Sequence, residues 1–309
     1  MGASLETTGT SPGTPAGAGV ETTGTSGGRR VEMVMGTAVG IDVRTPLPPR
    51  LLDRLLDDAF GWLRWVDDTF STYKPGSPIS RLARAEPTGL LPEAHEIPEI
   101  REVLDRCAEL REATAGYFDA YASGRLDPSG YVKGWAAERV SRALAAAGAA
   151  DHCVNAGGDV RVRGWAGPDR AWRIGIRHPH RDVVCKVLAA RDLAVATSGS
   201  YARGPHIIDP HRARPVTEPG SVTVAGPDLA VADAYATALY AMGSTRARSF
   251  ALPEPYDFLI ITDDGRGLST PGFARHVITP SVTPARPATQ PDVRRAEGQA
   301  SGCRDRYST

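Results

Sequence analysis

Closely spaced strand-like runs are the feature that most limits how this chain can fold. Between residues 152 and 262, several such runs follow one another at the distance of a hairpin. Strands joined so closely pair antiparallel, because a parallel pair needs a long crossover connection. A purely doubly wound parallel sheet is therefore disfavoured. The expected strands are His152–Asn155, Asp159–Gly164, Trp172–Arg177, Val183–Ala189, Leu193–Ala196, Ser221–Ala225 and Tyr256–Thr262.

Helical patterns lie before and between these strands. Apolar residues recur at helical spacing in residues 51–70 and 99–114, and residues 132–147 are followed by Gly148. The Ala- and Leu-rich stretch from Gly226 closes on Gly243, a residue type that favours helix ends. A chain of 309 residues with these patterns predicts an α+β fold in which helices cover mixed β-sheets.

Composition separates one central domain from two terminal segments. Residues 1–30 and 280–309 are rich in Gly, Thr, Ser, Pro and Ala or Arg, so we expect disordered tails around a domain at 31–279. Val31–Ile41 is expected to be the first strand. No basic region followed by an apolar one and no lipidation cysteine is visible near the start, which favours a cytoplasmic location.

Charge and cysteine content exclude several classes of function. The 36 basic and 36 acidic residues balance, so the chain shows no electrostatic footprint for nucleic acid, and we expect no membrane insertion. The four cysteines form no CxxC pair, which argues against a zinc site. These properties fit an ordinary enzyme.

The helix between Gly226 and Gly243 carries a candidate metal site. Asp233 and Thr237 are four residues apart and therefore share one helix face. A carboxylate and a hydroxyl are hard oxygen ligands of the kind Mg²⁺ takes. Such a pair on a helix is more often ordinary solvated surface. The interpretation as a metal site therefore depends on three glycine-rich motifs upstream.

Those motifs occur in a fixed order before the helix. They are Gly130-Tyr-Val-Lys-Gly-Trp135, Asn155-Ala-Gly-Gly-Asp159, and Thr197-Ser-Gly-Ser-Tyr201 followed by His206-Ile-Ile-Asp-Pro210. With Met35-Gly-Thr37, Phe70-Ser-Thr-Tyr73 and Ser77-Pro-Ile-Ser-Arg-Leu82, the chain resembles the ApbE family of FAD:protein FMN transferases over roughly residues 31–279. The resemblance implies a flavin-binding core with a ligand groove.

The resemblance also implies an activity. FMN would be transferred from FAD to a Thr or Ser hydroxyl of an acceptor protein with an FMN-binding domain, and AMP would be released. Because phosphoryl transfer depends on charge neutralisation and alignment, Mg²⁺ is expected at the pyrophosphate. By motif position, its ligands would be the main-chain carbonyl of Gly130 or of a neighbouring residue, Asp233 and Thr237.

Other motif residues receive roles in the same way. His206 would position or deprotonate the incoming hydroxyl or contact phosphate, and Lys133, one of three lysines, would order the site. A helix-start lysine in water and a structural histidine are the ordinary alternatives. The residues expected at FAD are Met35, Ser71, Tyr73, Lys133, Gly157, Gly158, Asp159, Thr197, Ser198, Gly199 and His206.

Two other functions fit the same residues. Water as the nucleophile would make the protein an FAD pyrophosphatase that yields FMN and AMP, and loss of chemistry would leave a non-catalytic FAD-binding protein. Mere flavin binding needs no metal, so the Asp233–Thr237 pair argues against the carrier. Since Thr237 is assigned to the metal, we expect transfer to a separate protein rather than to this chain.

Overall fold

The computed structural model describes residues 26–85, 96–200, 204 and 206–278. The predicted tails lie outside these residues, except that residues 26–30 of the first tail are described. Strand β1 begins at Ser26, so the expected domain boundary at residue 31 falls inside a strand. The expected first strand at Val31–Ile41 is also wrong, because the chain reverses at Met35 and Gly36, whose φ angles are 53° and 68°, to form a hairpin.

An antiparallel sheet forms the middle layer of the described part. Its eight strands run in the order β1-β2-β3-β4-β7-β10-β11-β12, and each neighbouring pair is antiparallel. The strands are β1 (Ser26–Val34), β2 (Thr37–Leu47), β3 (His152–Ala156), β4 (Asp159–Arg163), β7 (Leu193–Gly199), β10 (Ser221–Gly226), β11 (Asp257–Ile261) and β12 (Gly267–Ser269).

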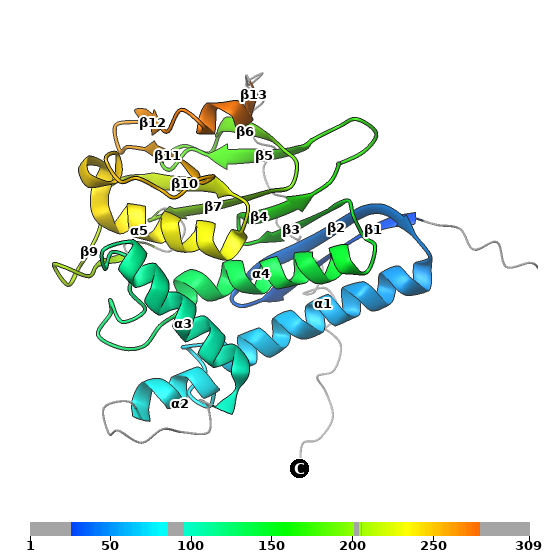
Figure 1. Cartoon of the computed structure of the whole chain (residues 1–309), viewed down its shortest axis with the longest axis horizontal. Coiled ribbons are helices and arrows are strands. Elements are labelled where there is room, and N and C mark those ends of the chain that lie inside the picture. Colours follow the sequence, from blue (N-terminus) through cyan, green and yellow to red (C-terminus); the bar gives the residue numbers. More distant parts are fainter. Residues whose placement is uncertain (1–25, 86–95, 201–203, 205, 279–309) are drawn as a thin grey trace, which may run out of the picture.

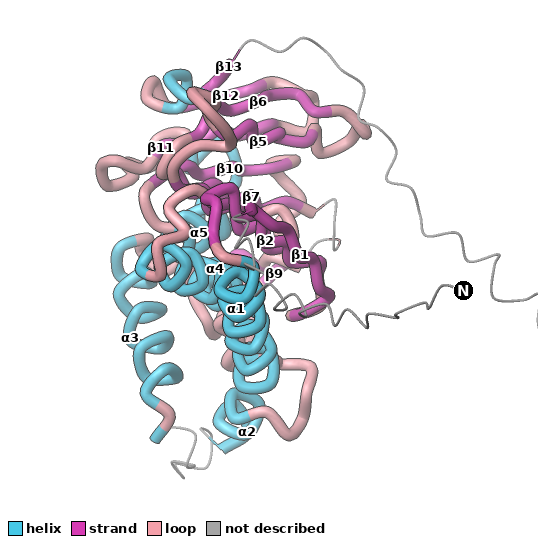
Figure 2. The backbone as a smooth tube through the Cα atoms, turned by 90° about the vertical axis from the view of Figure 1, so that its right-hand side faces the viewer, coloured by secondary structure: helices cyan, strands magenta, loops and turns pink. Residues whose placement is uncertain are grey.

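Helices cover one face of this sheet, and Figures 1 and 2 show them gathered on one side of the strands. Fully buried side chains such as Phe60, Leu63 and Tyr240 fill the layer between helices and sheet. The helices are α1 (Pro49–Phe70), α2 (Pro78–Ala85), α3 (Pro98–Ala113), α4 (Ser129–Ala146) and α5 (Leu229–Ala247). None of the helices in the described part is long and apolar enough to cross a lipid bilayer.

A smaller sheet packs on the opposite face. It consists of β5 (Trp172–Arg177), β6 (Val184–Ala190) and β13 (Val277–Ile278), and it encloses a second apolar core with the 3₁₀ helix η3 (Phe273–His276). Residues of β7 alternate between the two cores, since Val195 joins the second core while Ala194 and Ala196 face the helices. Ser198 therefore points toward the helical layer.

Local signals predicted most element positions to within a few residues. Gly243 does interrupt helical geometry, with φ 72° and ψ 161°, although the helix resumes for one turn to Ala247. The sequence patterns did not predict several short elements. These are the helix Pro78–Ala85, the short strands β12 and β13, and the two-residue strands β8 (Ile208–Asp209) and β9 (Arg214–Pro215). These short elements have too few residues for a periodic pattern.

Candidate active site

A polar cavity of about 220 Å³ opens where α4, α5 and the end of β7 meet. Most of the residues predicted from the motifs line it, although they come from segments far apart in the sequence. The lining includes Gly130, Lys133, Gly157, Thr197, Ser198, Gly199, His206, Asp233 and Thr237.

A close crossing of α4 and α5 sets the geometry of this cavity. At Gly134, a Cβ atom would lie 2.6 Å from the Leu229 carbonyl oxygen and 2.9 Å from the Ala230 Cα atom. Only glycine allows the two helix backbones to approach this closely. The crossing brings Gly130, at the start of α4, against the Thr237 side chain, whose Oγ1 is 3.4 Å from a Cβ placed at Gly130.

Asp233 and Thr237 point toward the cavity from one face of α5. The Asp233 carboxylate is nearly buried and accepts a hydrogen bond from the Gly134 amide at 3.2 Å. The Thr237 hydroxyl lies 3.3 Å from that of Ser198 on β7. The helix face predicted from the four-residue spacing therefore turns inward, not toward solvent.

Lys133 lies between two buried carboxylates. Its ammonium group forms an ion pair with Asp159 and lies 3.6 Å from the Asp233 carboxylate. The Asp159 side chain is 2% exposed and that of Asp233 is 6% exposed. A buried carboxylate is costly unless it is paired, and Lys133 supplies an oppositely charged partner here. The lysine therefore lines the candidate site as an ion-paired residue and is not a solvated helix-start residue.

Asp159 lies beneath the cavity and joins its parts. One carboxylate oxygen binds Lys133 and the other accepts a hydrogen bond from the Thr197 amide at 3.0 Å. The residue therefore holds α4 and β7 together and does not itself line the cavity. Gly158 is likewise outside the lining, where its amide donates to the Asn155 side chain at 2.9 Å.

Gly157 connects the cavity to the β1–β2 hairpin. It has a φ angle of 63°, and a Cβ atom there would lie 2.4 Å from the Thr37 hydroxyl oxygen. Both the backbone conformation and the close contact require glycine. The Met35-Gly-Thr37 motif is thereby placed next to the cavity wall.

His206 is exposed at the cavity mouth. Its Nδ1 atom lies 2.9 Å from the Gly204 carbonyl oxygen. A carbonyl only accepts hydrogen bonds, so Nδ1 is the donor in this contact, and in the neutral imidazole Nε2 is then the acceptor. This tautomer suits a group that receives a proton from an incoming hydroxyl.

Besides Gly158 and Asp159, three other predicted ligand residues do not line this cavity. The Tyr73 side chain is 92% exposed, and Met35 packs at the edge of the main core. The Ser71 carbonyl oxygen accepts hydrogen bonds from the hydroxyls of Ser77 and Ser80. Flavin contacts of these residues remain predictions.

Two acidic residues that sequence reasoning missed do line the cavity. Asp119 follows the aromatic pair Tyr117 and Phe118, and Asp127 precedes the glycine-rich turn of α4. Asp127 accepts a hydrogen bond from the Ser129 amide at 3.1 Å. Both residues lie directly beside recognised motifs, and this position could have indicated that they line the site. An Asp before a helix is, however, ordinarily interpreted as a helix cap.

The donor set of the cavity suits a phosphorylated ligand better than a stand-alone metal centre. Within the described ranges, no three His, Cys, Asp or Glu side chains are placed to hold a metal ion. Asp233, Thr237 and Gly130 offer a carboxylate, a hydroxyl and a main-chain carbonyl as hard oxygen donors, and Mg²⁺ commonly completes such partial sets with water and substrate phosphate. The arrangement can therefore position a metal-bound pyrophosphate beside a lysine.

The model of the ApbE family matches residues 35–124 and 121–260. The chain belongs to the ApbE family. Among curated relatives, the FAD:protein FMN transferase of Vibrio cholerae is 35% identical over 153 residues, which are 45% of this chain and 46% of the relative. That of Rhodobacter capsulatus is 40% identical over 157 residues, 48% of this chain and 30% of the relative. The chain thus aligns with half or less of these two ApbE relatives.

Solved structures of ApbE proteins share the fold. The flavin transferase ApbE of Vibrio cholerae aligns with a TM-score of 0.69 and 24% identity, covering 82% of this chain and 99% of that one. The ApbE protein of Thermotoga maritima aligns with a TM-score of 0.70 and 21% identity, covering 82% and 100%. The expected combination of helices and sheets is confirmed.

Proposed function

We propose that this protein transfers FMN from FAD to a Thr or Ser hydroxyl of a separate acceptor protein, with release of AMP. One observation carries the proposal: Gly130, Lys133, Asp233 and Thr237 converge on a single cavity. Family membership and the names of the relatives support the same flavin transfer.

Mg²⁺ would be held by Asp233, Thr237 and the carbonyl of Gly130. The Asp233 carboxylate and the Thr237 hydroxyl, which line the same cavity as Gly130, support this assignment, because Mg²⁺ prefers hard oxygen donors. When bound, the metal would neutralise charge on the pyrophosphate. Asp233 is fixed by the Gly134 amide, so its position is set before ligand arrives.

Lys133 and His206 would act on opposite sides of the reaction. The Lys133 ammonium, held by Asp159, would attract the phosphate oxygens. The Nε2 atom of His206 would accept the proton of the acceptor hydroxyl while the oxygen of that hydroxyl bonds to the flavin-side phosphorus. The bond from that phosphorus to the bridging oxygen breaks, and AMP leaves with that oxygen.

A single incubation separates this function from its alternatives. The protein, FAD, Mg²⁺ and an FMN-binding-domain acceptor are mixed, and the products are analysed by denaturing gel fluorescence and chromatography. Flavin fluorescence that stays with the denatured acceptor supports transfer. Free FMN and AMP without acceptor labelling would identify a pyrophosphatase, and unchanged FAD would identify a carrier.

Mass spectrometry tests whether the acceptor is a separate protein. Thr237 lies on a helix beside Ser198 and is assigned to the metal, so it is poorly placed for in-line attack on phosphorus. We expect the FMN mass on the acceptor alone. A stoichiometric FMN phosphoester on this chain would overturn transfer to a second protein.

A further inference from the structure

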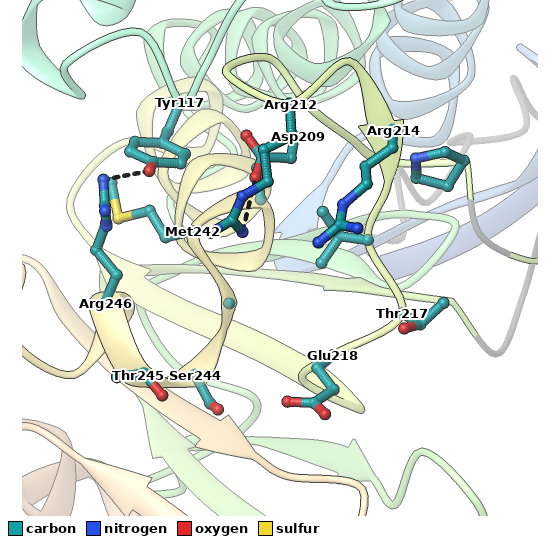
Figure 3. Close-up of a pocket in the computed structure, with 14 residues that line it drawn as sticks. Tyr117, Asp209, Arg212, Arg214, Thr217, Glu218, Met242, Ser244, Thr245 and Arg246 are labelled. Carbon is teal, nitrogen blue, oxygen red and sulfur yellow. Dashed lines mark hydrogen bonds and ion pairs between the residues drawn. The ribbon is translucent and has the colours of Figure 1, made fainter.

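Figure 3 shows a second and larger cavity, of about 570 Å³. It adjoins the candidate active site. The β8–β9 hairpin, the segment that leads to β10 and the last turn of α5 form its walls. Tyr117 lines both cavities. None of the motif residues assigned to FAD or the metal lies in this second cavity, so its lining has no role in the function proposed above.

The second cavity is basic. Its lining contains three arginines, Arg212, Arg214 and Arg246, and two acidic residues, Asp209 and Glu218. In Figure 3, the Arg212 and Arg214 side chains extend into the space from the hairpin, while Arg246 reaches Tyr117 on the other side. Guanidinium groups bind carboxylates and phosphates in a planar, two-point manner that lysine cannot match.

Two of these guanidinium groups are held in place before any ligand binds. Asp209, with a side chain 6% exposed, pairs with Arg212 at 3.3 Å. The Arg246 guanidinium donates a hydrogen bond to the Tyr117 hydroxyl and lies 5.2 Å from the centre of its ring. Such fixed side chains lose less conformational entropy on binding, which favours a specific site.

The two cavities are connected through the chain itself. His206, at the mouth of the first cavity, is only three residues before Asp209 in the second. Helix α5 carries Asp233 and Thr237, and the left-handed Gly243 redirects it so that its last turn lines the second cavity. A molecule bound there would therefore lie beside the place where the acceptor hydroxyl must enter.

The available ring surface argues against a nucleotide as the ligand. Within the described lining, Tyr117 is the aromatic residue, and its ring is already covered by Arg246 and by His211, whose ring centre is 4.4 Å away. A base would find no free face on which to stack. Acidic side chains need only the guanidinium groups and the nearby hydroxyls.

We propose that this arginine-lined cavity binds acidic side chains of the acceptor polypeptide and so positions its hydroxyl at the active site. This inference rests on the proposed function for its biological meaning, but binding of acidic peptide can be measured without any flavin transfer.

A direct binding experiment tests the proposal. The probe is a fluorescein-labelled peptide of alternating Asp and Gly around a central Thr, and its control carries Asn in place of Asp. Fluorescence anisotropy should detect binding of the Asp peptide alone, and that binding should weaken as salt is raised. Equal binding of both peptides would overturn the proposal.

Matched variants locate the binding site. Arg212→Gln with Arg214→Gln should weaken binding of the Asp peptide by about tenfold or more, since two charge-assisted contacts are lost. Both residues are exposed, so the fold should persist, which circular dichroism verifies. Arg248→Gln, an exposed arginine outside the cavity lining, should leave peptide binding unchanged. If AMP affinity instead follows Arg212 and Arg214, the cavity is a nucleotide site and the proposal is wrong.

Transfer kinetics separate this inference from the proposed function. In the double variant, the KM for the acceptor should rise while the KM for FAD stays unchanged. Transfer with an unchanged acceptor KM would overturn the docking site and leave the function standing. Arginine-dependent peptide binding without any FMN transfer would overturn the proposed function and leave the docking site standing.

Discussion

Asp233 is the residue on which the proposed chemistry depends most. Removing its carboxylate would leave a hydroxyl and a carbonyl, too little negative charge to dehydrate Mg²⁺. Asp233→Ala should therefore lower turnover by roughly two or more orders of magnitude. The measurement is FMN transfer as a function of Mg²⁺ concentration, with FAD binding followed separately.

Asp233→Asn provides the sharper comparison. The amide keeps the volume and an oxygen that can accept from Gly134, but it lacks the charge. If this variant transfers FMN at nearly the wild-type rate, the carboxylate does not hold a metal.

His152 should make stability depend on pH. Burial lowers the pKa of this fully buried imidazole to about 4, and it binds Ser141 and the Ala149 carbonyl oxygen while neutral. The unfolded chain takes up the proton near pH 6.5, so the stabilisation is complete above that pH and is lost as pH falls toward 4.

Chemical unfolding at pH 7 and pH 5 measures this effect. His152→Gln should reduce the difference in unfolding free energy between the two pH values by about 2 kcal/mol. His180→Gln, at an exposed position, is the control. An equal pH dependence in wild type and His152→Gln would show that His152 is not responsible.

At the scale of elements, the α4–α5 crossing determines whether the site can form. Gly134→Ala would place a methyl group 2.6 Å from the Leu229 carbonyl oxygen, and a backbone atom cannot move aside as a side chain can. The helices must separate, which should cost roughly 1–3 kcal/mol of stability and displace Gly130 from Thr237. Thermal unfolding and FMN transfer should both decline.

Gly61 offers a matched control for that substitution. It also lies within a helix, α1, but a Cβ atom there meets nothing within 4 Å. Gly61→Ala should stabilise the protein by roughly 0.5–1 kcal/mol, because alanine loses less backbone entropy in a helix. Unchanged stability in Gly134→Ala would contradict the close crossing.

At the scale of the whole molecule, strand β1 defines where the folded domain starts. Its Gly28 backbone packs beside Leu52 of α1, and Arg30 forms an ion pair of 2.5 Å with Asp57 on the same helix. A chain of residues 31–279 would lack half of this strand. Its unfolding free energy should fall by at least about 1 kcal/mol, or roughly 2–4 °C in Tm.

A chain of residues 26–279 should unfold at the same temperature as the full chain and bind FAD equally well. Comparing the two shortened chains by thermal unfolding and FAD titration measures the contribution of the first half of β1. Loss of FAD binding in the 26–279 chain would mean that residues outside this range contribute to the ligand site.

The sequence by itself determined the local elements and indicated most of the residues that line the candidate site. Helical and strand periods, glycine at helix ends and hairpin spacing act over a few residues, so they placed α1, α4, α5 and most strands. The motif order likewise indicated the family. Asp233 and Thr237 could be paired because a helix fixes residues four apart on one face.

Only the tertiary structure decided which distant groups meet. Strands β5 and β6 belong to the smaller sheet, so β4 pairs with β7 in the main sheet. Because of this pairing, Asp159 contacts both Lys133 and the Thr197 amide. The arginine-lined cavity likewise joins a hairpin to the end of α5, separated in sequence by β10. Such contacts arise from long-range packing, which local residue patterns do not encode.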